Sequence, residues 1–513
     1  MSRKYICAIC IGFFISTFVM AQAESNSISG TVLDQSDAVV RGASVSLVRV
    51  EDNQVYLTTT TDSRGHFEFK NVRSKKYYLN VRASGFAGYQ IEQNFLDSVD
   101  HLMIRLTVAP LSQVVQVTAT QHDFTTEATV SGRNLEERSP RDLAQSLRNE
   151  TGVFAVRRGQ INLDPNIRGL SENQIGMFVD GTRTFAAGPA RMDSDLSHVS
   201  FHDVQEILIT KGPYAFTEGA GTMSAVEVTT FSPPFYSDGF EVHGRGGFNY
   251  GENGVYRDGF GTIWAGNDKF RGSISHNTQL GNDYRAGDGS AVRGDFKSYA
   301  NRATFGLKPS KETFLEYKFG FQEQKDIDYE GRLLDATYFI TRSHALKFDY
   351  TPLKGIVSQV FGKFYSNNKG HLMNNNEKPT AQAIPGRIPP FGLDISLPTE
   401  SKTFGGNYYA AINYKQYDLK FGGDFFNLDQ NANRFVSRRD NGVLLFNDIV
   451  WGGANINDQG LYFNTTRRGA RFSVGGTVRI DFVQANAARA SDFFLANTDG
   501  DLKQKETNFS AAF

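Results

Sequence analysis

Apolar and polar residues alternate with a period of two over many short segments of the chain. Residues 312–324 read ETFLEYKFGFQEQ, in which every second residue from Leu315 to Phe321 is apolar and the residues between them are polar or glycine. The segment 417–426, YDLKFGGDFF, has the same pattern. Successive side chains of a strand point to opposite faces, so this period predicts strands with one apolar and one polar face.

The first of three regions, residues 27–107, is predicted to be a β-sandwich. Its short alternating strands are separated by turn residues every 8–12 positions or so, which is typical of that architecture. In TDSRGHFEFKNV, a turn leads into a strand that places Phe67 and Phe69 on one face. We interpret His66, which has acidic neighbours in this stretch, as solvated surface rather than a metal ligand.

The second region, residues 121–233, is predicted to be a compact α+β unit. Its strands are broken by Gly and Pro, and one helix is expected in SPRDLAQSLRNE. Ser139 is the expected N-cap of this helix and Pro140 lies in its first turn. Leu143 and Leu147 would then share one face of the helix.

The third region, residues 235–513, is predicted to form a transmembrane antiparallel β-barrel. Strand-like segments of roughly ten residues recur here, separated by loops rich in Gly, Asn, Asp and Arg. A closed barrel satisfies every backbone hydrogen bond in lipid. A soluble sandwich gives similar alternation, so the prediction rests on the number of such segments and on the export signal described next.

The N-terminus, residues 1–23, is predicted to be a secretory signal peptide. MSRKYICAICIGFFISTFVMAQA has a basic start, a short apolar stretch and a small-x-small ending. The two cysteines of the sequence, Cys7 and Cys10, both lie within it, so the mature chain is expected to have neither a disulfide nor a thiolate. No later run of about 18 apolar residues predicts a transmembrane helix.

Composition agrees with a mainly β protein. The 513 residues include 42 Phe, 21 Tyr and 50 Gly but only 2 Trp, and aromatic residues favour pleated surfaces whereas glycine favours tight turns. The formal net charge is −1, which gives no indication of nucleic-acid binding. No nucleophile–base arrangement or phosphate-binding loop stands out, so we do not expect an enzyme.

Two regions resemble known families. The first resembles the carboxypeptidase regulatory-like domain through GTVLD, RGASVSL, TDSRGHFEF and VRASGF. The second resembles the plug domain of the TonB-dependent outer-membrane transporters. Its matching segments are Ile167-Arg168-Gly169, Phe178-Val179-Asp180-Gly181, the run from Val204 to Gly212-Pro213, and the stretch from Gly219 to Thr229.

The glycines and charged residues of the plug-like motifs are suited to the turns in which we expect them. We assign a role in plug architecture to Arg168, Gly169, Asp180, Gly181, Gly212 and Pro213. The three glycines each close a strand at a turn where φ is expected to be positive. The two charged residues lie beside these turns and are suited to pairing with a polar barrel interior. An independent soluble α+β domain would explain the same residues.

Residues 112–120, SQVVQVTAT, resemble a TonB box. The stretch is β-branched and extended, and the periplasmic partner of such transporters, TonB with its inner-membrane energising complex, binds a segment of this kind by adding it to a sheet edge. The resemblance implies that Val114, Val115, Val117 and Thr118 couple the chain to TonB. The alternative is the last strand of the sandwich or the first strand of the plug.

The barrel region is short for this family. Barrels of about 22 strands at roughly ten residues per strand need more residues than 235–513 provide. We therefore expect the C-terminal strands to be missing from this chain, with a smaller barrel as the alternative.

One methionine suggests a cargo. Met192 lies in GPARMD, residues 188–193, a polar loop in which no core is expected to need it. In FGKFYSNNKGHLMNNN, residues 361–376, His371 and Met373 are two positions apart and would share one side of a strand. Thioethers select Cu(I), and imidazole tolerates it.

These segments, together with YANRATFGLKP and YEGRLLDATYF, resemble the TonB-dependent copper receptors. The ligands of that subfamily are a Cys, a Met four residues later and a barrel His-x-Met. The resemblance implies Met192, His371 and Met373 as metal ligands, with Gly188 where the subfamily has its cysteine. In the alternative interpretation, Met192 is an adaptable apolar contact on the plug and HLM is an ordinary strand end.

The predicted function is active transport across the outer membrane of a Gram-negative bacterium, with TonB and outer-membrane lipid as partners. Copper is the cargo that the resemblance implies, and no cofactor is expected. Uptake of a siderophore, cobalamin or a glycan is the alternative within this class. An outer-membrane receptor or adhesin that does not transport is the alternative from another class.

Overall fold

The computed structural model describes residues 25–106 and 127–513 with short gaps, and it divides into two compact units. The first unit comprises residues 1–114 with 352–358, and the second comprises 115–351 with 359–513. The predicted signal peptide and TonB box lie outside the described residues. The gaps, which include Gly212 and Pro213, are residues 36, 51–54, 74, 84–85, 87–88, 96–98, 133–134, 136–139, 141, 172–173, 212–215, 218, 220–222, 238, 470–471 and 499–500.

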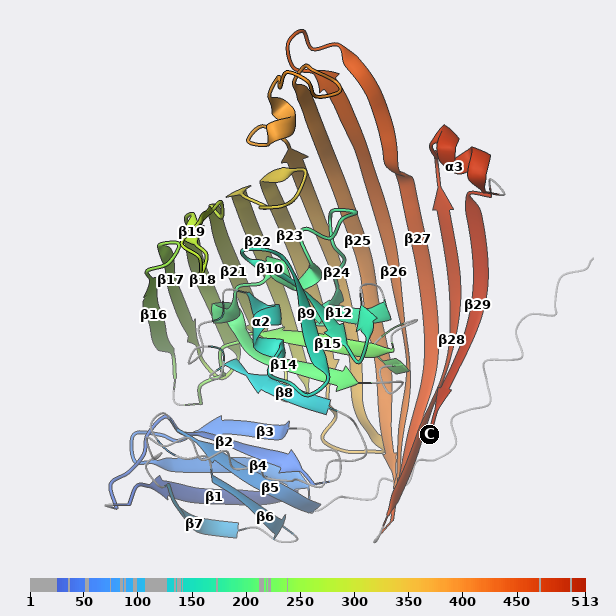
Figure 1. Ribbon diagram of the computed structural model, residues 1–513. Coiled ribbons are helices and arrows are strands. Elements are labelled where there is room, and N and C mark those ends of the chain that lie inside the picture. Colours follow the sequence, from blue (N-terminus) through green and yellow to red (C-terminus); the bar gives the residue numbers. More distant parts are fainter. Residues whose placement is uncertain are drawn as a thin grey trace, which may run out of the picture. The chain divides into compact units, whose positions relative to one another are not determined.

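The N-terminal unit contains two β-sheets around one core (Figure 1). One sheet has the order β4–β1–β7 and the other the order β3–β2–β5–β6. Phe67 and Phe69 are both buried in the shared core, which confirms the predicted apolar face. The strands are β1 (Ser25–Leu33), β2 (Ser44–Arg49), β3 (Val55–Thr60), β4 (His66–Arg73), β5 (Lys75–Arg82), β6 (Tyr89–Phe95) and β7 (Val99–Arg105).

The plug, defined here as residues 127–230, forms the interior of the second unit. Its main sheet has the order β13–β12–β15–β14–β8, and a smaller sheet has the order β11–β10–β9. The elements are β8 (Glu127–Ser131), α2 (Leu143–Leu147), β9 (Val153–Gly159), β10 (Asn162–Ile167), β11 (Leu170–Ser171), β12 (Ile175–Val179), β13 (Thr182–Arg183), η2 (Asp195–His198), η3 (Phe201–Asp203), β14 (Val204–Lys211) and β15 (Ser224–Thr230).

The predicted plug helix exists but begins later than expected. Asp142 is the N-cap of α2, and its side chain accepts a hydrogen bond from the backbone N–H of Gln145, so Pro140 precedes the helix. The expected cap, Ser139, lies outside the described residues. Asp is among the preferred N-cap residues, because its carboxylate accepts hydrogen bonds from the free N–H groups at the start of a helix. Leu143 and Leu147 are both fully buried, as the spacing predicted.

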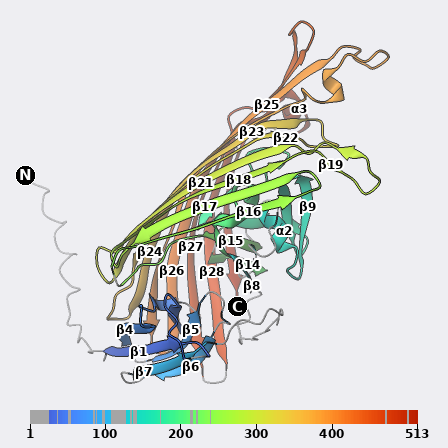
Figure 2. The same cartoon turned by 90° about the vertical axis from the view of Figure 1, so that its left-hand side faces the viewer.

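The strand wall is a sheet of 12 strands that follow one another in chain order from β16 to β29 (Figure 2). It curves around the plug, whose elements lie in front of it in Figure 1. The strands are β16 (Glu241–Gly251), β17 (Tyr256–Gly266), β18 (Phe270–Gly281), β21 (Phe296–Leu307), β22 (Thr313–Ile327), β23 (Asp335–Tyr350), β24 (Val357–Asn374), β25 (Leu393–Tyr414), β26 (Tyr417–Arg438), β27 (Leu444–Arg468), β28 (Ser473–Ala487) and β29 (Lys503–Ala512).

Small elements occupy the connections of the wall. They are β19 (Tyr284–Arg285), β20 (Ala291–Val292), η5 (Pro379–Ala381) and α3 (Asp492–Asn497). Within the described part of the chain, none of the helices is long and apolar enough to cross a membrane.

The wall has the predicted two faces. In β22, the polar side chains of Gln322 and Gln324 point inward and are buried, and both amide groups donate toward the Ser197 carbonyl of the plug. Tyr317, on the opposite face, remains exposed. The polar face of the alternation therefore binds the plug, and the apolar face points away from it.

Candidate functional site

Met192 is not a surface residue, contrary to the expectation of a loop with no core. It is 4% exposed and belongs to a buried apolar cluster that also contains Met373 of β24. The cluster forms where the plug loop meets inward-facing side chains of the wall, among them Tyr329 and Phe339. The loop sequence could not show this, because the partners of Met192 come from distant parts of the chain.

His371 has the same orientation as Met373. Alternate residues of β24 are buried, and both side chains lie on the inward face, as predicted from their spacing. The imidazole is 1% exposed and packs on Phe339, with 4.5 Å between ring centroids. Neither ring nitrogen has a hydrogen-bond partner among the described residues. A buried histidine with both nitrogens unpaired is costly, and such a group calls for an explanation.

Asp193 places a carboxylate beside this imidazole. Its Oδ1 lies 3.6 Å from Nδ1 of His371, and its Oδ2 lies 3.3 Å from Nε2 of His198. The two carboxylate oxygens also accept hydrogen bonds from the backbone N–H groups of Ala187 and Gly188. Burial alone would raise the pKa of Asp193, but the two imidazoles beside its carboxylate keep that pKa well below its usual range.

Gly188 faces the same imidazole. A Cβ built on this glycine would lie 2.3 Å from Cε1 and 2.7 Å from Nδ1 of His371, and 3.2 Å from Oδ1 of Asp193. The position that carries the cysteine in the resembling subfamily therefore points at His371 in this fold. In this chain, the nearest negative charge belongs to Asp193 instead.

Arg191 fixes the loop that carries Met192 and Asp193. Its guanidinium forms two hydrogen bonds of 2.9 Å with the Asp164 carboxylate and one of 2.8 Å with Asp195. Arg191 also has a φ of +49°, a left-handed backbone conformation that is uncommon for a residue with a side chain. These hydrogen bonds between the Arg191 guanidinium and two carboxylates hold the turn in place.

The backbone carbonyl of Met192 binds the loop to the plug and to the wall. It accepts hydrogen bonds from the Asn162 amide of the plug and, at 2.7 Å, from the Tyr329 hydroxyl that follows β22. Backbone and side chains of the loop are therefore held by the plug on one side and by the wall on the other.

The predicted turn residues of the plug have left-handed backbones. φ is +52° at Arg168, +85° at Gly169, +52° at Asp180 and +68° at Gly181. Asp180 accepts two hydrogen bonds from Thr230, one from its backbone N–H at 2.9 Å and one from its hydroxyl at 2.6 Å. Its Oδ1 also lies 2.7 Å from Nζ of Lys318 on β22, so a buried ion pair joins plug and wall here.

Sequence reasoning did not identify Asp193, Arg191 or Lys318. Asp193 follows Met192 directly, so its position in the loop was the one available signal. The structure also brings three carboxylates together in the wall loops, those of Asp283, Asp295 and Asp328. Arg293 donates a 2.6 Å hydrogen bond to Asp328, so part of their charge is already compensated by the protein.

Family profiles match two parts of the chain. The profile of the carboxypeptidase regulatory-like domain matches residues 27–109, and that of the TonB-dependent receptor plug domain matches residues 120–226. The chain carries a TonB-dependent receptor plug domain. No curated protein sequence matches the chain significantly.

Solved structures of TonB-dependent transporters have the same fold. The copper transporter OprC is 20% identical, with a TM-score of 0.66, and the match covers 75% of this chain and 59% of OprC. A double mutant of the Serratia marcescens hemophore receptor HasR, in complex with HasA and heme, is 14% identical, with a TM-score of 0.58 and coverage of 75% and 58%. The ferric citrate transporter FecA is 12% identical, with a TM-score of 0.56 and coverage of 75% and 59%. This chain thus spans about three fifths of the length of these proteins.

The plug and the wall together bury one imidazole beside one carboxylate, and this imidazole packs on Phe339 of the apolar cluster that contains Met192 and Met373. The His371 side chain is buried, so solvent outside the protein does not reach the imidazole. Soft sulfur and borderline nitrogen donors of this kind suit copper among the biological metals. These described side chains are groups that can bind a ligand.

Proposed function

We propose that this protein takes up a scarce nutrient across the outer membrane in a TonB-dependent manner, and that its cargo is copper. The plug domain match and the shared fold of the transporters support the class of function. The observation that carries the cargo is His371, a buried imidazole with two unpaired nitrogens that packs on Phe339, a member of the same apolar cluster as Met192 and Met373.

Copper suits these donors as Cu(I). Thioether sulfur and neutral imidazole are ligands that this ion accepts, whereas Mg²⁺ and Ca²⁺ require oxygen. The negative charge that a cysteine thiolate would supply is absent at Gly188, and Asp193 supplies a carboxylate next to the same imidazole. We expect a site that binds Cu(I) more weakly than one with a thiolate, because carboxylate is a harder ligand than sulfur.

An anionic metal chelate is a second candidate cargo. A cavity of about 500 Å³ lies between the plug hairpin β9–β10 and the wall loops, and four arginines line it. They are Arg157, Arg158, Arg293 and Arg332, with two carboxylates beside them, those of Asp328 and Glu330. Guanidinium groups bind carboxylates and phosphates in pairs of hydrogen bonds, so this cavity favours a chelate with anionic groups.

The cargo is tested by Cu(I) binding to the purified full-length protein in competition with a chromogenic Cu(I) chelator. We expect binding by the parent and loss of binding in a Met192→Ala/His371→Ala variant. Met223 is half-exposed and lies outside the site, so Met223→Ala is a matched control that should bind like the parent. Binding that ignores the double substitution would overturn the copper site. The arginine-lined cavity would then be tested with ferric chelates.

Transport is tested separately from binding. Substitution of Val115 by proline removes a backbone N–H from the predicted TonB box and should block strand addition by TonB. We expect copper uptake by cells to fall to the level of a strain without TonB, while copper binding by the purified variant is unchanged. Signalling that persists without TonB, with no copper uptake even by cells that hold the parent, would favour a receptor that does not transport.

A further inference from the structure

The turn directly after β22 forms one side of the arginine-lined cavity. Asp328, Glu330 and Arg332 of this turn line the cavity. The backbone N–H of Arg332 donates a 3.1 Å hydrogen bond to the carbonyl of Tyr329, which closes the turn. Arg293 lines the cavity as well and donates a 2.6 Å hydrogen bond to Asp328. Two of the four arginines are therefore attached to one short turn.

Tyr329 belongs to the same turn, but its side chain contacts the loop of the candidate copper site. The hydroxyl donates a 2.7 Å hydrogen bond to the backbone carbonyl of Met192. The ring is buried in the apolar cluster that contains Met192 and Met373. Its centroid lies 6.4 Å from that of Phe339, which also packs on His371. One residue between two lining residues of the cavity thus contacts the loop that carries a candidate ligand.

The plug side of the cavity contacts the same tyrosine ring. Gly159, at the end of β9, lines the cavity, and a Cβ built on it would lie 2.4 Å from Cε1 of Tyr329. The backbone of the β9–β10 hairpin therefore packs directly on the ring. Arg157 donates hydrogen bonds of 2.9 Å and 3.0 Å to the carbonyls of Gly159 and Gln160. Tyr329 thus touches both sides of the cavity, the hairpin that carries Arg157 and the turn that carries Arg332.

The charges around the cavity favour a multivalent anion. Its lining residues include four arginines and two carboxylates, so positive charge exceeds negative charge by two. Arg157 and Arg332 are exposed, so a ligand can approach both guanidinium groups. Each guanidinium can donate two parallel hydrogen bonds to a carboxylate or phosphate group. The cavity of about 500 Å³ is large enough for a small anion with several such groups.

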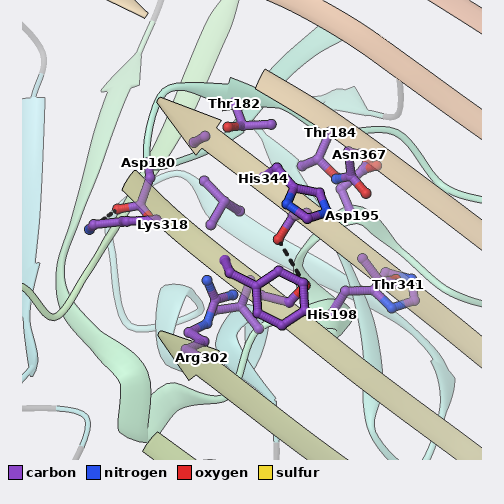
Figure 3. Close-up of a pocket in the computed structure, with 16 residues that line it drawn as sticks. Asp180, Thr182, Thr184, Asp195, His198, Arg302, Lys318, Thr341, His344 and Asn367 are labelled. Carbon is purple, nitrogen blue, oxygen red and sulfur yellow. Dashed lines mark hydrogen bonds and ion pairs between the residues drawn. The ribbon is translucent and has the colours of Figure 1, made fainter. Parts of the chain in front are cut away.

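The small cavity between plug and wall that Figure 3 shows is less suited to such an anion. It has a volume of about 30 Å³, and Arg302 and Lys318 line it. Both cations already have carboxylate partners. Arg302 lies 3.3 Å from Asp203, and Lys318 lies 2.7 Å from Asp180, a pair that is drawn in Figure 3. Of these two cavities, the arginine-lined one therefore fits a multivalent anion better.

We propose that the arginine-lined cavity binds a small anion with two or more carboxylate or phosphate groups, and that this anion strengthens Cu(I) binding through Tyr329. The anion itself need not carry a metal, which distinguishes this binding from the uptake of an anionic chelate. The coupling to copper rests on the proposed copper site, whereas the anion site does not.

The coupling follows from the position of Tyr329. An anion held by Arg157 and Arg332 joins the hairpin to the turn, and so holds the tyrosine against the Met192 carbonyl. A loop that is held in its ligand-binding position before the metal arrives costs less to order, which raises affinity. Coupling between two sites is reciprocal, so bound Cu(I) strengthens anion binding by the same factor.

The first test is calorimetric titration of the purified full-length protein, without copper, with tricarballylate and with pyrophosphate. The first probe carries carboxylate groups and the second carries phosphate groups, so the two distinguish the kinds of anion. We expect saturable binding of at least one probe. Binding should weaken at least about tenfold in Arg157→Gln/Arg332→Gln, because hydrogen bonds to charged groups are lost. Absence of binding of both probes would overturn the anion site.

Two further variants keep this test specific. Arg257→Gln/Arg342→Gln is the matched control, since these exposed arginines of the wall do not line the cavity. Arg332→Glu changes an exposed turn residue and leaves the plug hairpin intact, and we expect it to weaken binding at least about tenfold as well. Binding that ignores the substitutions of the cavity arginines, or that falls equally in the control, would overturn the anion site.

The second test measures Cu(I) affinity in competition with a chromogenic chelator, with and without a saturating concentration of the anion that binds. A blank without protein corrects for copper bound by the anion. We expect the anion to raise Cu(I) affinity at least about fivefold. Tyr329→Phe keeps the ring but removes the hydroxyl, and it should lose this gain while it binds the anion like the parent when copper is absent. Tyr365→Phe is the matched control and should keep the gain, since Tyr365 is a buried tyrosine of β24 that does not line the cavity.

The outcomes of the second test are distinct. Equal Cu(I) affinity with and without the anion would overturn the coupling. A gain that persists in Tyr329→Phe would overturn the role of the tyrosine. Absence of Cu(I) binding in the parent would contradict the proposed cargo instead, and the anion titration alone would then decide whether the cavity is an anion site.

Discussion

Gly188 of the plug and His371 of the wall lie in direct contact across the candidate site. A Cβ on Gly188 would approach Cε1 of His371 to 2.3 Å, closer than any real contact, so the imidazole fills the space that a side chain at position 188 would occupy. The resembling copper receptors have a cysteine at this position. In this chain, the absence of a side chain allows the ring to lie against the backbone of the loop.

Gly188→Cys should strengthen Cu(I) binding by about tenfold or more, equivalent to about 1.4 kcal/mol. The imidazole must shift to admit the Cβ, and the new thiolate would be a soft, anionic ligand beside it. The measurement is competition against a Cu(I) chelator. Gly188→Ala is the matched control, because it forces the same shift without a sulfur, and we expect it to bind no better than the parent. Equal gains in both variants would mean that ring displacement, not the thiolate, controls affinity.

Asp180→Asn should destabilise the plug by about 3–5 kcal/mol, because it leaves Lys318 buried without its counter-charge. Lys318→Gln should cost a similar amount, and the double variant less than the sum of the two. The measurement is urea unfolding of all three variants at neutral pH. If the losses in unfolding free energy of the two single variants simply add in the double variant, the 2.7 Å ion pair makes no specific contribution to stability.

The ion pair of Asp180 and Lys318 should keep its contribution to the free energy of unfolding as pH falls from 7 to 5. Burial alone would raise the pKa of Asp180, but the charges of Lys318, Lys363 and Arg302 hold that pKa below its usual range. A carboxyl group with a depressed pKa in the fold contributes stability above the pKa of the unfolded chain, and this contribution is lost as pH falls through the folded pKa. We therefore expect the difference in unfolding free energy between parent and Asp180→Asn to stay constant from pH 7 to pH 5. A difference that shrinks over this range would contradict the prediction.

Arg191→Met should destabilise the plug by about 3–5 kcal/mol and should also weaken copper binding. The substitution leaves the carboxylates of Asp164 and Asp195 buried without the guanidinium that they share. The turn before Met192 then loses the hydrogen bonds that hold it. Arg191→Lys keeps the charge but not the planar pair of donors, and we expect an intermediate loss. Thermal unfolding and Cu(I) titration measure the two effects. Full rescue by lysine would mean that charge alone positions the loop.

Asp142→Asn should remove a pH dependence from plug stability. Burial is the main cause that raises the pKa of Asp142 from 3.8 to about 6, although Arg157 and the backbone N–H groups of α2 oppose it. Between about pH 6 and pH 4 the folded state then holds a proton that the unfolded state releases, so this group stabilises the fold as pH falls through that window. Asparagine remains an N-cap but does not titrate.

The measurement is urea unfolding of parent and Asp142→Asn at pH 7, 6 and 5. We expect the variant to be more stable than the parent at pH 7 and the difference to shrink toward pH 5. A difference that grows on acidification would reverse the sign of the argument.

The local sequence pattern was sufficient to predict which side chains share a face in β22 and β24. The alternation in residues 312–324 predicted which side chains of β22 face the plug, and Gln322 and Gln324 do so. Spacing of two predicted that His371 and Met373 share a face, which β24 confirms. The start of the helix was less easily predicted, since several residues of this segment are good caps and the structure shows Asp142 as the N-cap of α2.

The candidate site could be predicted only in part. Met192, His371 and Met373 were predicted as ligands from residue type and resemblance, but the burial of Met192 and the carboxylate of Asp193 were not foreseen. A loop residue is surrounded by side chains from other strands, and its sequence neighbours do not reveal them. The sequence predicted that Asp180 is suited to pairing with the interior of the wall, which the ion pair with Lys318 bears out. It did not predict which residue is the partner, because no local rule selects one lysine of the wall over another.

The sequence by itself determined the period of the strands, the turns that need left-handed backbones and the residue types able to bind a soft metal. These follow from the sterics of neighbouring residues and the chemistry of single side chains. The tertiary structure alone decided that Gly188, Asp193 and His371 meet, and that four arginines line one cavity. Such contacts depend on the register of the strands and on how the wall curves around the plug, and these are set by the packing of the whole domain.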